Sequence, residues 1–152
     1  MPTHFVPGLP FHAPSVAPTA ELMRASGRSR WPADHGVEPA TGDLWLVAVA
    51  DVELGLAVVT EPGPHWAAVI PAWPARGVPR GGARIEPWGL LPALDVWPAH
   101  EVTIPSDLLT RRLGAATPRG TFPALLSADA GRLPDDLEEV WSRLNLGIDT
   151  GR

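Results

Sequence analysis

The chain has 152 residues, 45% of them hydrophobic and 19% charged, so it is long enough for one folded domain with its own core. It contains no cysteine, which excludes a disulfide framework, a thiol nucleophile and a thiolate metal site. Its net charge of −5 argues against a general nucleic-acid-binding surface, because such surfaces are basic.

The many helix-breaking residues indicate the class of fold. The chain has 19 prolines and 15 glycines, which favour short strands and turns over long helices. No apolar run approaches the roughly 20 residues that span a bilayer, and prolines interrupt the N-terminal segment where a signal peptide would lie. We therefore expect a mainly β, cytoplasmic protein with no membrane segment.

Residues 1–41 are predicted to form an N-terminal arm. Residues 1–18 are rich in proline, and their apolar side chains suit either a groove, on this protein or on a partner, or a mobile tail. Residues 20–26 predict a short helix, with Thr19 as its N-cap and Gly27 as its end. The composition of the segment that follows, up to Thr41, is that of a linker.

From residue 42 onward the pattern predicts strands. Three continuous apolar runs, rich in valine, occupy residues 44–50, 54–60 and 66–70. Because apolar and polar residues do not alternate in these runs, we expect both faces of the sheet to be covered. Shorter strands are predicted at residues 83–86, 94–97 and 101–104.

Two C-terminal helices are also predicted. Residues 105–114 read as a helix with Ser106 as its cap and Gly114 as its end. Residues 134–146 read as a second helix, which begins with a proline and ends at Gly147. Its apolar side chains recur at the spacing of one helix face, on Leu137, Val140, Trp141 and Leu144.

The order of these elements resembles that of the MazF/PemK toxin family. The segments GDLWLV, LAVV and AAVIP are similar to the family's first three strands, and HEVTIPSDLLTRRLG is similar to its last strand and following helix. The resemblance covers about residues 42–146. It implies a small SH3-like barrel of five or six short strands over residues 42–152, a bacterial protein, and homodimers. Residues 1–41 have no counterpart in the family.

The catalytic residues of that family are missing at the matching positions. The resemblance implies a metal-free ribonuclease only if an arginine begins the second strand and a threonine or serine ends the third. Here the second strand begins with Glu53, and residues 70–73 carry no hydroxyl group. Since an arginine stabilises the negative charge of a phosphodiester transition state and a glutamate repels it, we expect no nuclease activity of the family's kind.

These observations leave two functional hypotheses. The first is a non-catalytic protein-binding or regulatory module, in a setting such as a toxin–antitoxin or defence system, that binds a protein partner or a second copy of itself. The second is an RNA-cleaving or RNA-binding toxin whose active residues have moved to Arg76, Arg80 and Arg84, the only basic cluster.

The predicted binding site lies on the loop of residues 74–88. Tryptophan beside arginine is typical of protein-binding hot spots and of platforms for single-stranded bases. The predicted binding residues are Trp73, Arg76, Arg80, Arg84 and Trp88. In the alternative interpretation, the tryptophans that border prolines or glycines, Trp31 and Trp97 among them, pack under the chain.

The remaining chemistry-bearing residues suggest no further site. Trp45, Trp66 and Trp141 are expected in the core, because they fall within strands or the helix stripe. The histidines at positions 4, 12, 35, 65 and 100 lack the spacing of metal ligands. The chain has no lysine to complete a phosphate-binding loop. We therefore expect no metal and no small-molecule cofactor.

Overall fold

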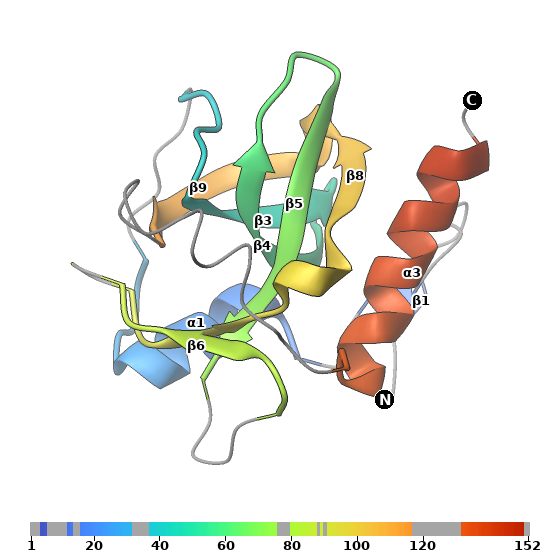
Figure 1. The fold of residues 1–152 in the computed structure, drawn as a ribbon. Helices are drawn as coiled ribbons and strands as arrows, with labels where there is room; N and C mark the ends of the chain where they lie inside the picture. The colour runs from blue at the N-terminus through green and yellow to red at the C-terminus, as the bar shows by residue number, and fades with distance from the viewer. Residues whose placement is uncertain are drawn as a thin grey trace.

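The computed structural model describes residues 4–5, 12–13, 16–31, 37–75, 80–87, 89, 91–116 and 132–150. Their elements, in chain order, are β1 (His4–Phe5), β2 (His12–Ala13), α1 (Pro18–Ser26), β3 (Asp43–Val49), β4 (Val52–Glu61), β5 (Trp66–Pro74), β6 (Ala83–Ile85), β7 (Leu94–Val96), the 3-10 turn η1 (Pro98–His100), β8 (Val102–Pro105), the 3-10 turn η2 (Ser106–Leu108), β9 (Leu109–Ala115) and α3 (Asp135–Thr150). This content confirms a mainly β protein (Figure 1).

One antiparallel sheet of seven strands organises the molecule (Figure 1). Its strand order is β6-β7-β5-β4-β3-β9, and β8 pairs with β5 off this path. One edge of β5 pairs with β4, whereas its other edge pairs with β8 along Trp66–Val69 and with β7 along Ala72–Pro74. The strands predicted from the three apolar runs and from the three shorter segments are therefore confirmed.

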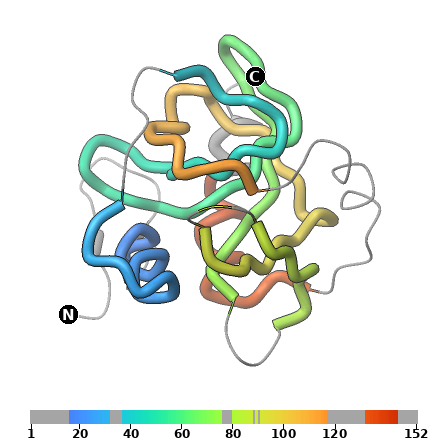
Figure 2. The backbone as a smooth tube through the Cα atoms, turned by 90° about the vertical axis from the view of Figure 1, so that its left-hand side faces the viewer, coloured from blue at the N-terminus to red at the C-terminus, as the bar shows by residue number. Residues whose placement is uncertain are grey.

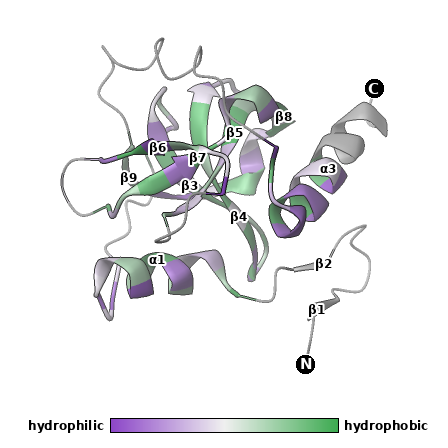
Figure 3. Ribbon diagram, turned by 60° about the horizontal axis from the view of Figure 1, so that its bottom comes forward, coloured by the Kyte–Doolittle hydropathy of each residue, from purple (hydrophilic) through white to green (hydrophobic). Residues whose placement is uncertain are grey.

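Both faces of the central strands are buried, as the continuous apolar runs predict. Along β3, Trp45 and Val47 belong to one buried cluster, whereas Leu44 and Leu46 belong to another. The alternation follows from the strand period of two. Each face therefore needs its own cover, and Figures 1 and 3 show α1 and α3 on different sides of the sheet.

Helix α3 covers the face that carries Trp45. Leu137, Val140, Trp141 and Leu144 are buried in that cluster, which confirms the predicted apolar stripe. The helix continues to Thr150, so the prediction that it ends at Gly147 is wrong. A glycine lowers helix stability by only about 1 kcal/mol and blocks no backbone hydrogen bond, so it ends a helix only where the chain also turns.

Helix α1 covers the other face and contacts β4 and β5. Leu22 is fully buried there, and Figure 2 shows α1 beside the hairpin of β3 and β4. Gly27 ends the helix in the left-handed conformation, with φ of 72°, as predicted. The prediction that Thr19 caps the helix is wrong: Ala17 is the N-cap and Pro18 opens the helix, so Thr19 already lies in the first turn.

The predicted helix at residues 105–114 is also wrong. Only Ser106–Leu108 form a 3-10 turn, and Leu109–Ala115 form β9, which pairs with β3. Local signals for a helix are present, but β3 would otherwise keep one edge of unpaired backbone groups. Pairing with β9 satisfies those groups, so a tertiary contact overrides a local propensity.

The N-terminal arm is described only in part. β1 and β2 pair as a short antiparallel ladder, and β2 lies against β4. Phe5 lies in β1, but its side chain is outside the described part of the chain, as are residues 6, 9 and 11, whereas Val16 is exposed. Within the described part of the chain, no helix is both long enough and apolar enough to cross a membrane.

Candidate functional site

The predicted binding residues do not come together as one exposed surface. Trp73 lies in β5 with 4% of its surface exposed and packs in the core, so its predicted exposure is wrong. Its side chain belongs to the buried cluster that α3 covers, together with Trp97 and Trp141. Arg76 and Trp88 lie outside the described residues. Whether the loop binds a partner stays a prediction.

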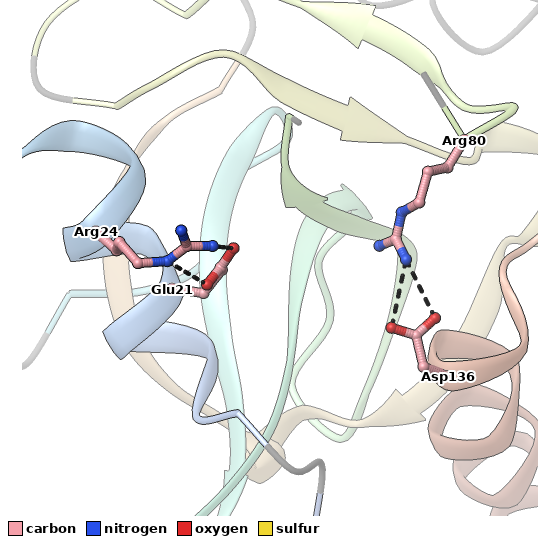
Figure 4. Close-up of polar contacts among 4 residues, drawn as sticks. All are labelled: Glu21, Arg24, Arg80 and Asp136. Atoms are coloured by element: carbon pink, nitrogen blue, oxygen red, sulfur yellow. Dashed lines mark hydrogen bonds and ion pairs between the residues drawn. The ribbon is translucent and has the colours of Figure 1, made fainter. Parts of the chain in front are cut away.

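The two described arginines of this cluster contact carboxylates on different elements. Arg80 contacts Asp136 at the start of α3, with 3.4 Å between Nη1 and the carboxylate oxygens (Figure 4). Arg84 donates to the buried carboxylate of Asp95 in β7 at 3.0 Å. This hydrogen bond raises the pKa of Arg84, against the opposing effect of desolvation. Both guanidinium groups thus already face a negative charge.

The other tryptophans match the predicted burial only in part. Trp45 and Trp141 are buried as expected, and Trp31 and Trp97 also pack inside, as the alternative interpretation holds. Trp66 was expected in the core, but 47% of its surface is exposed. It is the first residue of β5 and lies beyond the segment that pairs with β4, so no neighbouring strand covers it on that side.

Glu53, which the sequence resemblance aligns with the family's catalytic arginine, is a structural carboxylate. Glu53, near the start of β4, accepts hydrogen bonds from the backbone N–H and the hydroxyl of Thr19, at 2.9 and 2.7 to 2.8 Å. A carboxylate at the first turn of a helix is favourable because the helix N-terminus is electropositive. Residues 70–73, which the sequence resemblance aligns with the family's hydroxyl position, are all buried within β5.

A groove of about 640 Å³ lies near the β4–β5 turn, on the part of the surface that the structure describes. We call it the proline groove. The linker, the β4–β5 turn, β3, η2 and β9 all contribute to its lining. The lining residues are Val37, Glu38, Pro39, Trp45, Pro62, Gly63, Pro64, Ser106, Leu109 and Thr110.

Two hydrogen bonds fix the shape of this groove. The Ser106 hydroxyl donates to the Gly63 carbonyl at 2.7 Å, and the Ser106 backbone N–H donates to the His65 carbonyl at 2.9 Å. A side chain at Gly63 would collide with the backbone carbonyl of Trp66, so the tight turn requires glycine. The β4–β5 turn is therefore tied to η2, and the groove is largely preformed.

The charge of the groove is negative. Glu38 lines it, and the exposed Glu61 and Asp107 each stand next in sequence to a lining residue. The lining contains no arginine, and the segment 43–75 carries four acidic residues and no basic one. These three carboxylates form no ion pair within the part of the chain that the structure describes.

A second cleft, of about 400 Å³, lies between η1, β8 and α3. Its charged residues already have partners. Glu101 accepts a hydrogen bond from Thr60 at 2.6 Å, and Arg132 pairs with Asp135 and Glu138. His100 lines it too, but the described residues include no group of three or more histidines and carboxylates placed to hold a metal ion.

Sequence reasoning missed the proline groove. The sequence analysis assigns most of its residues to a linker, a turn and a helix. The signal that could have found it is the presence of prolines at residues 39, 62 and 64, two of them within the acidic segment 43–75. The comparisons with known proteins add no assignment, since neither a family model nor a curated protein matches this chain.

Proposed function

We propose that this chain is a non-catalytic protein-binding module, built on an SH3-like barrel of the kind found in the MazF/PemK family. The strand order supports the barrel: β3 pairs with both β4 and β9, and β5 pairs with both β4 and β8. A meander whose first strand also pairs with its last is the arrangement of a small barrel. A 3-10 turn precedes the last strand.

The observation that carries the proposal is the chemistry of the proline groove. A site for RNA needs cationic groups for the phosphates, and most protein–nucleic-acid hydrogen bonds go to phosphate and sugar. The groove instead offers three prolines, the exposed side chain of Val37 and the carboxylate of Glu38. A concave site whose lining mixes polar and apolar groups and contains no cation suits a protein segment better than a chain of phosphates.

The contacts of the arginine cluster support the same proposal. Phosphate would have to displace the carboxylates that already bind Arg80 and Arg84. Glu53, where the family has arginine, is held by the start of α1. Nuclease chemistry at position 53 would therefore need a positive charge in place of the carboxylate, and helix α1 would have to lose its contact with Glu53.

The test compares RNA with protein as the ligand of the full chain. The triple variant Arg76→Ala/Arg80→Ala/Arg84→Ala is matched with Arg28→Ala/Arg30→Ala/Arg132→Ala, which removes the same charge elsewhere. We expect no RNA cleavage and equal, weak RNA binding by all three proteins. From native lysate, we expect one protein at fixed stoichiometry with the wild type and both triple variants, but not with Thr110→Trp, which narrows the groove. RNA cleavage, or salt-dependent RNA binding lost only in the first triple, would establish the toxin hypothesis instead.

A further inference from the structure

We propose that the proline groove binds an extended segment of a partner protein, which carries a basic residue and adds to the outer edge of β9 as a short strand. The inference rests on the proposed function, and it names the conformation and the charge of the ligand. It draws on three features of the molecule: the unpaired edge of β9, the position of the groove at that edge, and the charge around the groove.

Strand β9 lies at the edge of the sheet. It pairs with β3 on one side, and on its other side it pairs with no strand among the described residues. Trp31 occupies the far end of β9, where its indole donates to the Leu113 carbonyl. Within the part of the chain that the structure describes, the backbone of Thr110 and Arg111 has no hydrogen-bond partner outside the pairing with β3. The first half of β9 therefore offers an edge for a further strand.

The proline groove lies at this first half of β9. Leu109 and Thr110 both line the groove, and neighbouring side chains of a strand point to opposite faces. A groove that both residues line therefore reaches the edge of the strand and is not confined to one face. The exposed Thr110 turns its hydroxyl back to the Leu46 carbonyl, at 3.3 Å. A segment bound in the groove would thus run beside the first residues of β9.

An extended segment is the occupant that can pair with this edge. A ligand that covers N–H and C=O groups without bonding them costs free energy, because those groups lose their hydrogen bonds to water. A helix satisfies its own backbone groups and would leave those of β9 unpaired, whereas an added strand bonds them. Strand β9 shifts its register with β3 at two points, and such irregularities bend a strand. We therefore expect a ladder of only a few residues.

The charge around the groove favours a basic residue in the ligand. Glu38 lies in the lining, and the exposed Glu61 and Asp107 each stand next in sequence to a lining residue. None of the three has an ion-pair partner among the described residues. An arginine or lysine of the ligand would meet carboxylates that are not already neutralised, a favourable contact that also steers the encounter.

Charge also argues against two other occupants. RNA would bring phosphates to a groove whose lining contains no cation. A second copy of this chain that paired its own β9 at this edge would bring the two copies of Arg111 close together, and like charges on neighbouring strands are destabilising. The partner is therefore a different protein, and the experiment has to separate it from a second copy.

The first experiment selects a phage-displayed library of random dodecapeptides on the immobilised full chain and, in parallel, on Glu38→Arg/Asp107→Arg. The matched control is Asp51→Arg/Glu139→Arg, which makes the same charge change at exposed positions elsewhere. We expect the wild type and the control to enrich peptides that contain a basic residue. A synthetic peptide of the enriched sequence should lose at least about tenfold in affinity with the charge-reversed variant and with Thr110→Trp, which narrows the groove.

The second experiment tests the strand conformation on the wild-type chain. Single backbone N–H groups of the synthetic peptide are replaced by N-methyl groups, one position at a time. In an added strand only alternate residues point their N–H groups at β9, so we expect a loss of at least about tenfold in affinity at every second position. Binding of the unmethylated peptide should slow hydrogen exchange within Leu109–Ala115 and leave β6, at the opposite edge of the sheet, unchanged.

The outcomes separate this inference from the proposed function. A peptide that Thr110→Trp excludes, but that is acidic or tolerates N-methylation at every position, would overturn the inference and leave a protein-binding module. Self-association of the free chain that Thr110→Trp abolishes would assign the groove to a second copy and also overturn it. No groove-dependent peptide, together with RNA binding lost in the Arg76, Arg80 and Arg84 variant, would overturn both. Circular dichroism checks the fold of each variant, and the N-methyl series needs no variant.

Discussion

The two faces of the sheet are equally well buried, but they are built with different chemistry. The face under α1 contains one tryptophan, Trp31, whose indole N–H donates to the Leu113 carbonyl at 3.0 Å. Arg111 donates to the Trp31 carbonyl, and Glu53 holds the start of α1. The face under α3 contains four tryptophans whose indole N–H groups have no partner within the described residues, namely Trp45, Trp73, Trp97 and Trp141.

The difference teaches how each helix is held. Helix α1 is short and lies beyond a linker, so directional hydrogen bonds fix its position. Helix α3 is held by apolar packing of large rings. Burial of their indole N–H groups costs free energy, because these groups lose their hydrogen bonds to water. Removal of a single polar atom should therefore destabilise the packing of α1 on the sheet. Removal of a large buried side chain should destabilise the packing of α3.

The largest effect is expected from Trp141→Ala. This side chain is buried between α3 and β4, with its ring against Gly55. Its removal leaves a cavity that rigid strands cannot fill, so we expect a loss of about 3–5 kcal/mol in the free energy of unfolding. Urea denaturation measures it, and Glu139→Ala on the exposed side of α3 should change stability by less than about 0.5 kcal/mol. Equal effects of the two substitutions would contradict the packing of α3.

A smaller loss in the free energy of unfolding is expected from Glu53→Ala, which removes the carboxylate that binds Thr19. Hydrogen bonds to charged groups contribute about 1.5–3 kcal/mol, and we expect a loss in this range. Hydrogen exchange should show faster opening of α1 than of α3, because only α1 loses its anchor. Asp51→Ala, in the neighbouring turn, is the control. If α1 and α3 opened to the same degree, the two helices would not be held differently.

The effects of Trp31→Phe and Trp97→Phe on stability compare the two faces of the sheet directly. The first leaves the Leu113 carbonyl without its donor, so we expect a loss of about 1–3 kcal/mol. The second removes a buried N–H that has no partner among the described residues, and this gain offsets the smaller ring, so we expect a change of less than about 1 kcal/mol. Thermal and urea denaturation of both variants give the two values. The reverse order would show that the indole of Trp97 is hydrogen-bonded in solution.

The smallest effect is expected from the Arg80–Asp136 pair at the start of α3. Its carboxylate side chain is 60% exposed, and exposed pairs contribute about 0–1 kcal/mol. A double-mutant cycle with Arg80→Ala and Asp136→Ala should give a coupling below about 1 kcal/mol that falls with added salt. A larger coupling would mean that polar contacts also hold α3, and the contrast between the two faces would weaken.

Local patterns were enough to predict most of the elements. The strands β3, β4 and β5 follow from continuous apolar runs, because burial on both faces demands apolar residues at every position. The stripe on α3 follows from the helical period. The left-handed end of α1 at Gly27 follows from the lack of a side chain there. In each case the information lies within a few neighbouring residues.

The candidate site could be predicted only in part. Prolines and acidic residues of the groove are visible in the sequence, but Pro39, Pro62 and Ser106 lie on three separate segments, and only folding brings them together. The tryptophans show the same limit. Trp66 begins β5 and Trp73 lies near its end, yet Trp66 is exposed and Trp73 is buried, because Trp73 packs in the cluster that α3 covers and Trp66 belongs to neither buried cluster.

The sequence by itself therefore determined the mainly β class, the apolar strands and the amphipathic terminal helix. Tertiary structure alone decided that Leu109–Ala115 is a strand, that Glu53 anchors α1 and that the β4–β5 turn meets η2. The physical reason is the distance along the chain. An edge strand needs a partner for its backbone groups, and the partner of β9 is β3, more than 60 residues earlier, beyond the reach of any local pattern.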